Sequence, residues 1–275
     1  MPGTLYLVPT PIGNLGDISE RMAETMAEVD FIAAEDTRVT VKLLNHLDIK
    51  KPMVTYHRHN CDTAGQTILR RLLEGESCAL VTDAGTPAIS DPGEDLVALC
   101  AANDVTVIAI PGPCALITAL SISGLPTARF TFEGFLPMNK KNRRVHLDSL
   151  RKEERTMLFY EAPHKLTDTL DDFLAVFGGE RRISLCRELT KLHEEVLRTT
   201  LAEAVAYHKE KEPRGEYVLV LEGAQPEVVE ADPGAALARV EQLREQGMSL
   251  KDAAAQAAAE FGLKKRQLYD MAIGK

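Results

Sequence analysis

Short apolar runs alternate with amphipathic stretches over the first half of the chain. Four of the runs are typical of buried strands and lie at Leu5–Pro9, Phe31–Ala34, Ala79–Thr82 and Val105–Ile110. Between them, apolar residues recur with helical spacing at Ser19–Val29, Val39–His46, Thr63–Glu74 and Asp95–Ala102. This alternation predicts a mostly parallel sheet with helices on both faces.

The second half of the chain repeats the theme with different strands. Strands are predicted at Phe130–Phe135, Thr156–Glu161, Arg182–Arg187, Glu194–Thr199 and Glu216–Leu221, with helices at Lys140–Lys152 and Lys165–Phe177. The last two strands are expected to pair antiparallel, which predicts a mixed sheet. Between the halves, residues 111–127 contain an apolar helix that we expect to be buried all round and to form a hinge.

The end of the chain has a purely helical pattern. Three short helices are predicted after Pro233, with Ser249 as an N-cap and with Gly247 and Gly262 as helix stops. Their spacing resembles a helix-turn-helix module, and the polar segment Gly223–Gly234 before it is typical of a linker. The fold class is therefore α/β, with domains expected at residues 1–113 and 114–224 and a helical module at 233–275.

Composition limits the classes of protein that this sequence permits. Hydrophobic residues make up 45% and charged residues 27% of the chain, as in a soluble globular protein, and no apolar run is long enough for a membrane span. The amino-terminal residues lack a basic stretch followed by an apolar one, so we do not expect secretion. Five scattered cysteines without C-x-x-C spacing argue against disulfides and a zinc site, so we expect a cytoplasmic protein without a metal. The net charge of -9 argues against nonspecific coating of nucleic acid but permits a local basic patch.

Three small loops rich in proline and glycine follow predicted parallel strands. They are VPTPIGNLGD from Val8, DAGTP from Asp83 and IPGPCA from Ile110. In an open α/β sheet, ligands bind at the carboxyl ends of strands, where glycine lets the backbone approach closely. A tight strand-to-helix turn would explain any one of these loops, but three favour a shared ligand crevice. None has the form of a dinucleotide fingerprint or a P-loop.

A set of motifs runs in order along nearly the whole chain and carries a resemblance to a known family. The motifs are LYLVPTPIGNLGDIS, AAEDTR, LVTDAGTPAISDPG, IPGPCALITALSISGLP, FEGFLP, FYEAPHKL and GEYVLVLEG. They resemble the ribosomal RNA small subunit methyltransferase I family, a branch of the tetrapyrrole methylase superfamily. The resemblance implies two α/β domains with S-adenosylmethionine (SAM) in the cleft between them. It also implies methylation of the ribose 2′-hydroxyl of a cytidine in the decoding region of small-subunit ribosomal RNA.

The resemblance also implies which residues hold the cofactor. The Gly-Gly-Asp-Pro loop of the relatives falls on residues 84–87, where alanine replaces the first glycine and threonine replaces the aspartate. The residues implied to bind SAM are Pro11, Ile12, Gly13, Ala84, Gly85, Thr86, Ile89, Cys114, Ala115, Tyr160 and Glu161.

Two residues of the AEDTR motif are candidates for catalysis. In C-methylating relatives an acidic residue at the position of Asp36 is implicated as the base, so Asp36 is the first candidate to accept the hydroxyl proton. Arg38 is expected to hold a phosphate or to orient that carboxylate. The alternative is that Glu35, Asp36 and Arg38 form a helix N-terminal cluster stabilised by the helix dipole.

Two basic segments are candidate RNA contacts. The first contains Lys140, Lys141, Arg143 and Arg144, and the second contains Lys264, Lys265 and Arg266. A solvated face would equally explain the first segment, and a packing or capping bundle would explain the helical tail.

The implied partners are ribosomal RNA within the assembled small subunit and a second copy of the chain, with the edge of the second sheet as the interface. A tetrapyrrole C-methyltransferase with the same SAM cleft is the alternative enzyme, and a catalytically inactive binding module is the third reading. The basic segments favour RNA over a small macrocycle.

Overall fold

The computed structural model describes residues 1–225 and 232–274. Residue contacts divide the chain into two compact units, Met1–Ala224 and Gln225–Lys275. Residues 226–231 of the predicted linker lie outside the described residues. Among the helices of the described residues, none is both long and apolar enough to cross a membrane.

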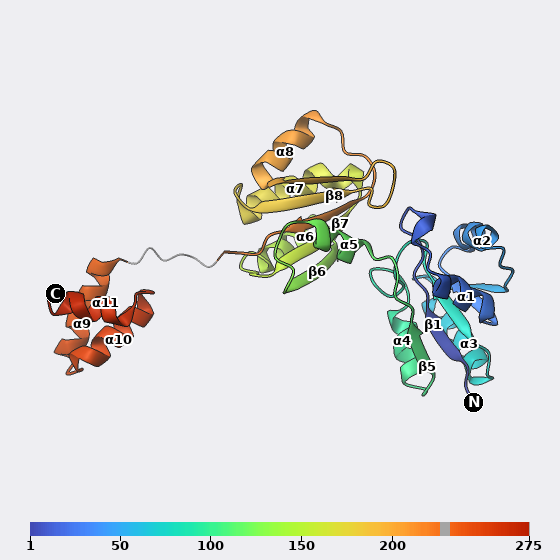
Figure 1. Ribbon diagram of the computed structural model, residues 1–275, viewed down its shortest axis with the longest axis horizontal. Helices are drawn as coiled ribbons and strands as arrows, with labels where there is room; N and C mark the ends of the chain where they lie inside the picture. Colours follow the sequence, from blue (N-terminus) through green and yellow to red (C-terminus); the bar gives the residue numbers. More distant parts are fainter. Residues whose placement is uncertain (226–231, 275) are drawn as a thin grey trace. The chain divides into compact units, whose positions relative to one another are not determined.

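The first sheet is parallel throughout and has the order β3-β2-β4-β1-β5. Its neighbouring strands β1 and β5 are labelled in Figure 1. Its strands are β1 (Thr4–Leu7), β2 (Phe31–Ala34), β3 (Met53–Thr55), β4 (Cys78–Val81) and β5 (Thr106–Ala109). The strands β2 and β4 are buried at every position because they lie inside the sheet and helices cover both faces. The predicted parallel sheet is therefore confirmed.

Helices separate these strands along the chain. They are the 3-10 helix η1 (Leu15–Asp17), followed by α1 (Glu20–Glu28), α2 (Thr37–His46), α3 (Cys61–Leu73) and α4 (Glu94–Ala101). Alternate residues of each strand face opposite sides of the sheet. Thus Ala33 and Leu80 pack with α3 and α4, whereas Ala34 and Val81 pack with α1 and α2.

The second sheet is mixed and has the order β6-β7-β10-β8-β9. Its strands are β6 (Phe130–Phe135), β7 (Thr156–Glu161), β8 (Arg182–Arg187), β9 (Glu195–Thr200) and β10 (Tyr217–Leu221). Only β6 and β7 run parallel among these pairs. One face packs on α5 (Ala115–Ile122), and the other packs on α6 (Lys140–Ser149), α7 (Pro163–Phe177) and α8 (Leu201–Glu210).

The predicted pairing of the last two strands is wrong, because β8 lies between β9 and β10. The two sequences show the physical reason. All five residues of β10 are buried, as a central strand requires, while β9 carries the half-exposed pattern of an edge strand. After β9 the chain forms α8, an element that was not predicted, and then enters the middle of the sheet.

The helix α5 is only partly buried, in contrast to the prediction from its apolar sequence. Leu116, Ala119 and Leu120 face the second sheet, whereas Ile117 is 49% exposed. A helix that covers one face of a sheet buries one stripe only. The proposed domain boundary at residues 113 and 114 stays a prediction; β5 of the first sheet ends before it, and α5 packs on the second sheet.

The second unit contains the three predicted helices, α9 (Pro233–Glu245), α10 (Leu250–Glu260) and α11 (Lys265–Ala272). Their core is small and rich in alanine, so the helices approach one another closely. Ser249 caps α10 by accepting a hydrogen bond from Asp252 N, as predicted. Gly247 and Gly262 have φ values of +92° and +66°, which fits their predicted role as helix stops.

Candidate active site

The loops that follow β1 and β4 are joined by hydrogen bonds. Thr10 N donates to Gly85 O at 2.9 Å, and Gly85 N donates to Thr10 O at 3.0 Å. The Thr10 hydroxyl also donates to Thr82 O at 3.0 Å. Gly85 has a φ of +88°, in the left-handed region that glycine adopts without a steric cost.

The loop after β5 joins the same group. The Thr86 hydroxyl donates to Pro113 O at 2.9 Å. The strand β1 lies between β4 and β5, so the three loops leave adjacent strands at the same edge of the sheet. The predicted convergence of the three loops is therefore confirmed.

A cavity of about 350 Å³ opens beside these loops and is also lined by the second sheet. Small-molecule sites typically enclose about 300–1,000 Å³. Most of the residues implied to bind the cofactor line it, namely Ile12, Ala84, Gly85, Thr86, Ile89, Cys114, Ala115, Tyr160 and Glu161. Pro11 and Gly13 are not among the lining residues.

Tyr160 connects this cavity to the helix α5. Its hydroxyl accepts a hydrogen bond from Leu116 N at 3.2 Å, and its ring makes edge contacts with Phe132 and Phe135. Burial raises the pKa of Tyr160, so the phenol stays neutral. The aromatic group thus forms a fixed apolar part of the cavity wall.

Gly13 lies against the loop that follows β8. A Cβ atom at Gly13 would lie 2.4 Å from Lys191 Cγ and 3.1 Å from Thr190 Oγ1. The first loop therefore touches the loop after β8 across the cleft, and only glycine permits this approach.

Three carboxylates that were not singled out as site residues line the cavity on the side of the first sheet: Glu35, Asp83 and Asp91. Burial raises the pKa of Glu35 and of Asp83. Burial, followed by the negative charge of Glu35, raises the pKa of Asp91 to about 6. Their position after the strand ends β2 and β4 was the available sequence signal. We refer to these three residues as the acidic wall.

Asp36, next to Glu35, is not among the residues that line the cavity. Its carboxylate caps α2 by accepting from Arg38 N at 2.8 Å, and it forms an ion pair with the Arg38 guanidinium at 2.6 Å. The hydrogen bonds from the Arg38 side chain and backbone lower the pKa of Asp36 to about 2. This is the helix N-terminal arrangement that the sequence left open as the alternative.

The opposite wall of the cavity carries carboxylates that have a partner. Lys191 Nζ lies 2.9 Å from Glu188 Oε1 and 2.9 Å from Glu216 Oε2. Burial alone would raise the pKa of Glu188, but hydrogen bonds from Glu216 N and Lys191 outweigh it and lower the pKa. We refer to Glu188, Lys191 and Glu216 as the paired wall.

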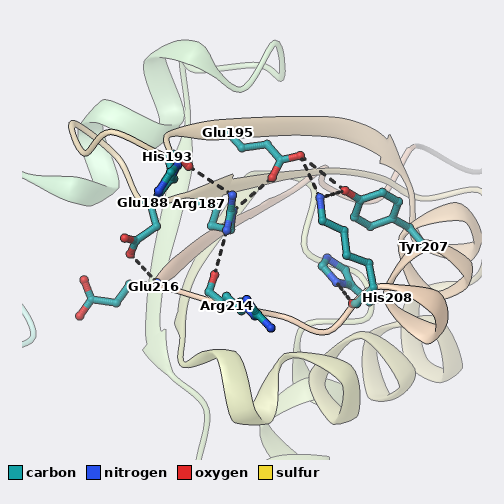
Figure 2. A network of polar contacts seen from close by, with 9 residues as sticks. Arg187, Glu188, His193, Glu195, Tyr207, His208, Arg214 and Glu216 are labelled. Carbon is teal, nitrogen blue, oxygen red and sulfur yellow. Dashed lines mark hydrogen bonds and ion pairs between the residues drawn. The ribbon is translucent and has the colours of Figure 1, made fainter.

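Arg187 directly precedes Glu188 and makes its polar contacts on the other face of the second sheet (Figure 2). Its guanidinium donates to His193 O at 3.3 Å and to Arg214 O at 3.4 Å, and it pairs with Glu195 at 3.2 Å. Arg187, Glu195 and Arg214 line a second cavity of about 310 Å³. Since successive strand residues point to opposite faces, Arg187 anchors the strand end while Glu188 lines the first cavity.

The predicted RNA-binding residues differ in exposure. Lys140, Lys141 and Arg144 are exposed on α6, while the Arg143 side chain is only 12% exposed and pairs with Asp172 at 2.6 Å. In the second unit, Lys264, Lys265 and Arg266 are all exposed at the start of α11. Within the two described ranges, no group of three His, Cys, Asp or Glu side chains is arranged to hold a metal ion.

The fold and the cavity identify the general class of the protein. Residues 4–205 match the family of tetrapyrrole (corrin/porphyrin) methylases. A solved structure of uroporphyrin-III C-methyltransferase from Thermus thermophilus, complexed with S-adenyl homocysteine, has the same fold, with a TM-score of 0.55 and 18% identity. The match covers 80% of this chain and 97% of that one.

Closer relatives define the family. The chain is 49% identical to the ribosomal RNA small subunit methyltransferase I of Halalkalibacterium halodurans, over 98% of this chain and 94% of the relative. It is also 49% identical to the protein of that name from Synechocystis, over 98% of both chains. Residues 230–275 match the C-terminal helix-turn-helix domain of the same family. The chain belongs to the ribosomal RNA small subunit methyltransferase I family.

Proposed function

We propose that the chain uses SAM to methylate the ribose 2′-hydroxyl of a cytidine in the decoding region of small-subunit ribosomal RNA. The observation that carries the proposal is the cavity formed by three post-strand loops and the end of β7. It is supported by relatives of nearly the same length whose names specify methylation of ribosomal RNA of the small subunit. The cytidine and its 2′-hydroxyl go beyond what these names state.

The chemistry of the cavity fits SAM. Bound SAM carries a sulfonium and an ammonium group and supplies the methyl group for transfer. The acidic wall offers three carboxylates whose pKa values are raised because burial disfavours their charged form. Small residues at Ala84 and Gly85 leave room beside the backbone. A cationic ligand in this cavity would stabilise the ionised wall.

Positioning is expected to supply most of the acceleration. A ribose hydroxyl is a weak nucleophile, and its attack on the methyl group must be in line with the bond that breaks. The loops are suited to this task because mutual hydrogen bonds fix Thr10, Gly85 and Thr86. Ala88 and Ser90, which flank Ile89, have φ values of +66° and +69°, so the second loop holds an unusual backbone conformation.

A carboxylate is proposed to accept the hydroxyl proton. The sequence-based proposal is Asp36, with Arg38 as its partner, and this stays a prediction. The geometry favours Glu35, because Glu35 lines the cavity and has a raised pKa, while Asp36 has a pKa of about 2 and therefore binds protons weakly.

RNA is proposed to bind two exposed basic surfaces. The first is formed by Lys140, Lys141 and Arg144 of α6, and the second by Lys264, Lys265 and Arg266 at the start of α11. Arg143 turns inward and is left out of the first surface. These surfaces favour an RNA acceptor over a tetrapyrrole, because a small macrocycle needs neither.

We propose that the acceptor is the assembled small subunit, that the protein acts in the cytoplasm and that it forms a homodimer. The edge strand β6 exposes Phe130 and Phe135 by 38% and 56%, which supports an interface there. A monomer mass from light scattering would refute the dimer.

Transfer of labelled methyl from SAM to small ribosomal subunits from a strain without this protein tests the proposal. The expected product is 2′-O-methylcytidine, identified by nucleoside analysis. Gly85→Val is the control, because a side chain at φ +88° distorts the loop beside the cavity and should prevent SAM binding. SAM binding without transfer to subunits would refute the RNA acceptor and favour tetrapyrroles.

Running the assay over a salt series with Lys140→Gln and Lys264→Gln variants tests each basic surface.

A further inference from the structure

Glu161 is a buried carboxylate at the end of β7, with an exposed fraction of 4%, and it lines the cavity. Its Oε1 accepts a hydrogen bond from Ala162 N at 2.9 Å. Its Oε2 accepts one from the Thr169 hydroxyl at 2.5 Å. Each carboxylate oxygen has a further lone pair, so Glu161 can accept another hydrogen bond from a group in the cavity.

Thr169 lies on α7 and is completely buried. Arg143 Nη2 donates to the Thr169 hydroxyl oxygen at 2.9 Å. Because a guanidinium has only donors, Thr169 Oγ1 must accept from Arg143. The single hydroxyl proton is therefore directed toward Glu161, which fixes both the rotamer of Thr169 and the acceptor role of Glu161.

Arg143 is in turn held by Asp172, with Nε 2.6 Å from Oδ2. Its side chain is 12% exposed, whereas the adjacent Arg144 side chain is 82% exposed. The two neighbouring arginines of α6 thus point in different directions. A chain of contacts therefore begins at Arg143 on α6, passes through Thr169 on α7 and ends at Glu161 in the cavity wall.

We propose that Arg143 and Thr169 are positioning residues that hold the Glu161 carboxylate as a hydrogen-bond acceptor for an N–H or O–H group of the bound cofactor. The inference rests on the proposed use of SAM. Neither Arg143 nor Thr169 is among the cavity-lining residues, so both act through Glu161. A carboxylate fixed by two internal donors needs little reorganisation when a ligand binds.

SAM affinity of the full chain without RNA, measured by isothermal titration calorimetry, tests this chain of contacts. Thr169→Val removes the hydroxyl at nearly constant shape and should raise the Kd for SAM by about 5- to 30-fold. Thr169→Ser keeps the hydroxyl and should restore a Kd near that of the wild type. Arg143→Met should also raise the Kd for SAM. Arg151→Met, which changes an exposed arginine just after α6, should leave the Kd unchanged.

A double-mutant cycle separates positioning from a general structural effect. Glu161→Gln should itself weaken SAM binding, and adding Thr169→Val to it should produce little further loss. An equal loss in both backgrounds, or wild-type affinity in Thr169→Val and Arg143→Met, would overturn the inference. Should Thr169→Val fail to fold, as thermal unfolding would show, Arg143→Met decides the matter, measured alone and in the Glu161→Gln background. If the wild-type chain binds no SAM, the proposed function itself fails.

Discussion

The two walls of the cavity both carry carboxylates, but they differ in how the negative charge is balanced. On the paired wall, Lys191 contacts Glu188 and Glu216, and the pKa of Glu188 is lowered. On the acidic wall, burial raises the pKa of Glu35, Asp83 and Asp91. Each carboxylate of the paired wall thus has a cationic partner within the protein. The carboxylates of the acidic wall are costly to ionise unless a proton or a cationic ligand binds them. Groups with such shifted pKa values are common in reactive or ligand-binding sites.

The largest expected effect comes from changing the two adjacent carboxylates after β2. We expect Glu35→Gln to lower the single-turnover rate of methyl transfer by about 10²- to 10⁴-fold, the usual contribution of a general base. Asp36→Asn should have a smaller effect on the rate, because Asp36 is already paired with Arg38 and lies outside the cavity lining.

The SAM Kd of both variants is the control that separates chemistry from binding. A greater loss of rate in Asp36→Asn than in Glu35→Gln, with equal SAM affinity, would return the role of base to Asp36.

An intermediate effect should follow when the paired wall loses its cation. Lys191→Met leaves Glu188 and Glu216 without their ammonium partner, so the pKa of Glu188 should rise and the free energy of unfolding should fall by about 1 kcal/mol. Carboxyl NMR titration measures the first change, and urea unfolding measures the second. Lys42→Met, at an exposed position of α2, serves as a surface control. An unchanged Glu188 pKa would show that Lys191 does not balance this wall.

The stability of the fold should depend on pH through Asp91. Its pKa is about 6 in the folded chain and 3.8 for the unperturbed group, so the folded state holds this proton more tightly. The resulting stabilisation is present below about pH 4 and is lost as the pH rises through about 6. Asp91→Asn cannot ionise, and its Tm relative to wild type should therefore increase between pH 4 and pH 7. A difference in Tm that stays constant with pH would contradict the raised pKa.

The elements of the fold were largely predictable because their burial patterns are local. Strands such as Phe31–Ala34 and Thr156–Glu161 lie where the apolar runs predicted them. The short strand β3 was missed because three partly exposed residues carry almost no periodic signal. The helix α8 was missed because it follows β9 directly through the cap Thr200.

The candidate site was predictable to a different degree. The loops after parallel strands converge because adjacent strand ends share one edge, so most of the residues that line the cavity could be anticipated by motif. The orientation of neighbouring side chains could not. Glu35 and Asp36 are consecutive, yet Glu35 lines the cavity and Asp36 caps α2. Arg143 and Arg144 are also consecutive, yet Arg143 faces the interior and Arg144 faces outward.

The sequence by itself determined the class of fold, the family motifs and the loops that form the cavity, because these depend on apolar periodicity and on glycine and proline at strand ends. Only the tertiary structure decided which charges balance one another. Lys191 meets Glu216, and Arg143 meets Thr169 and Asp172, across separate elements. The pKa values of the acidic wall likewise depend on burial and on charges brought together by folding, which distance along the chain does not encode.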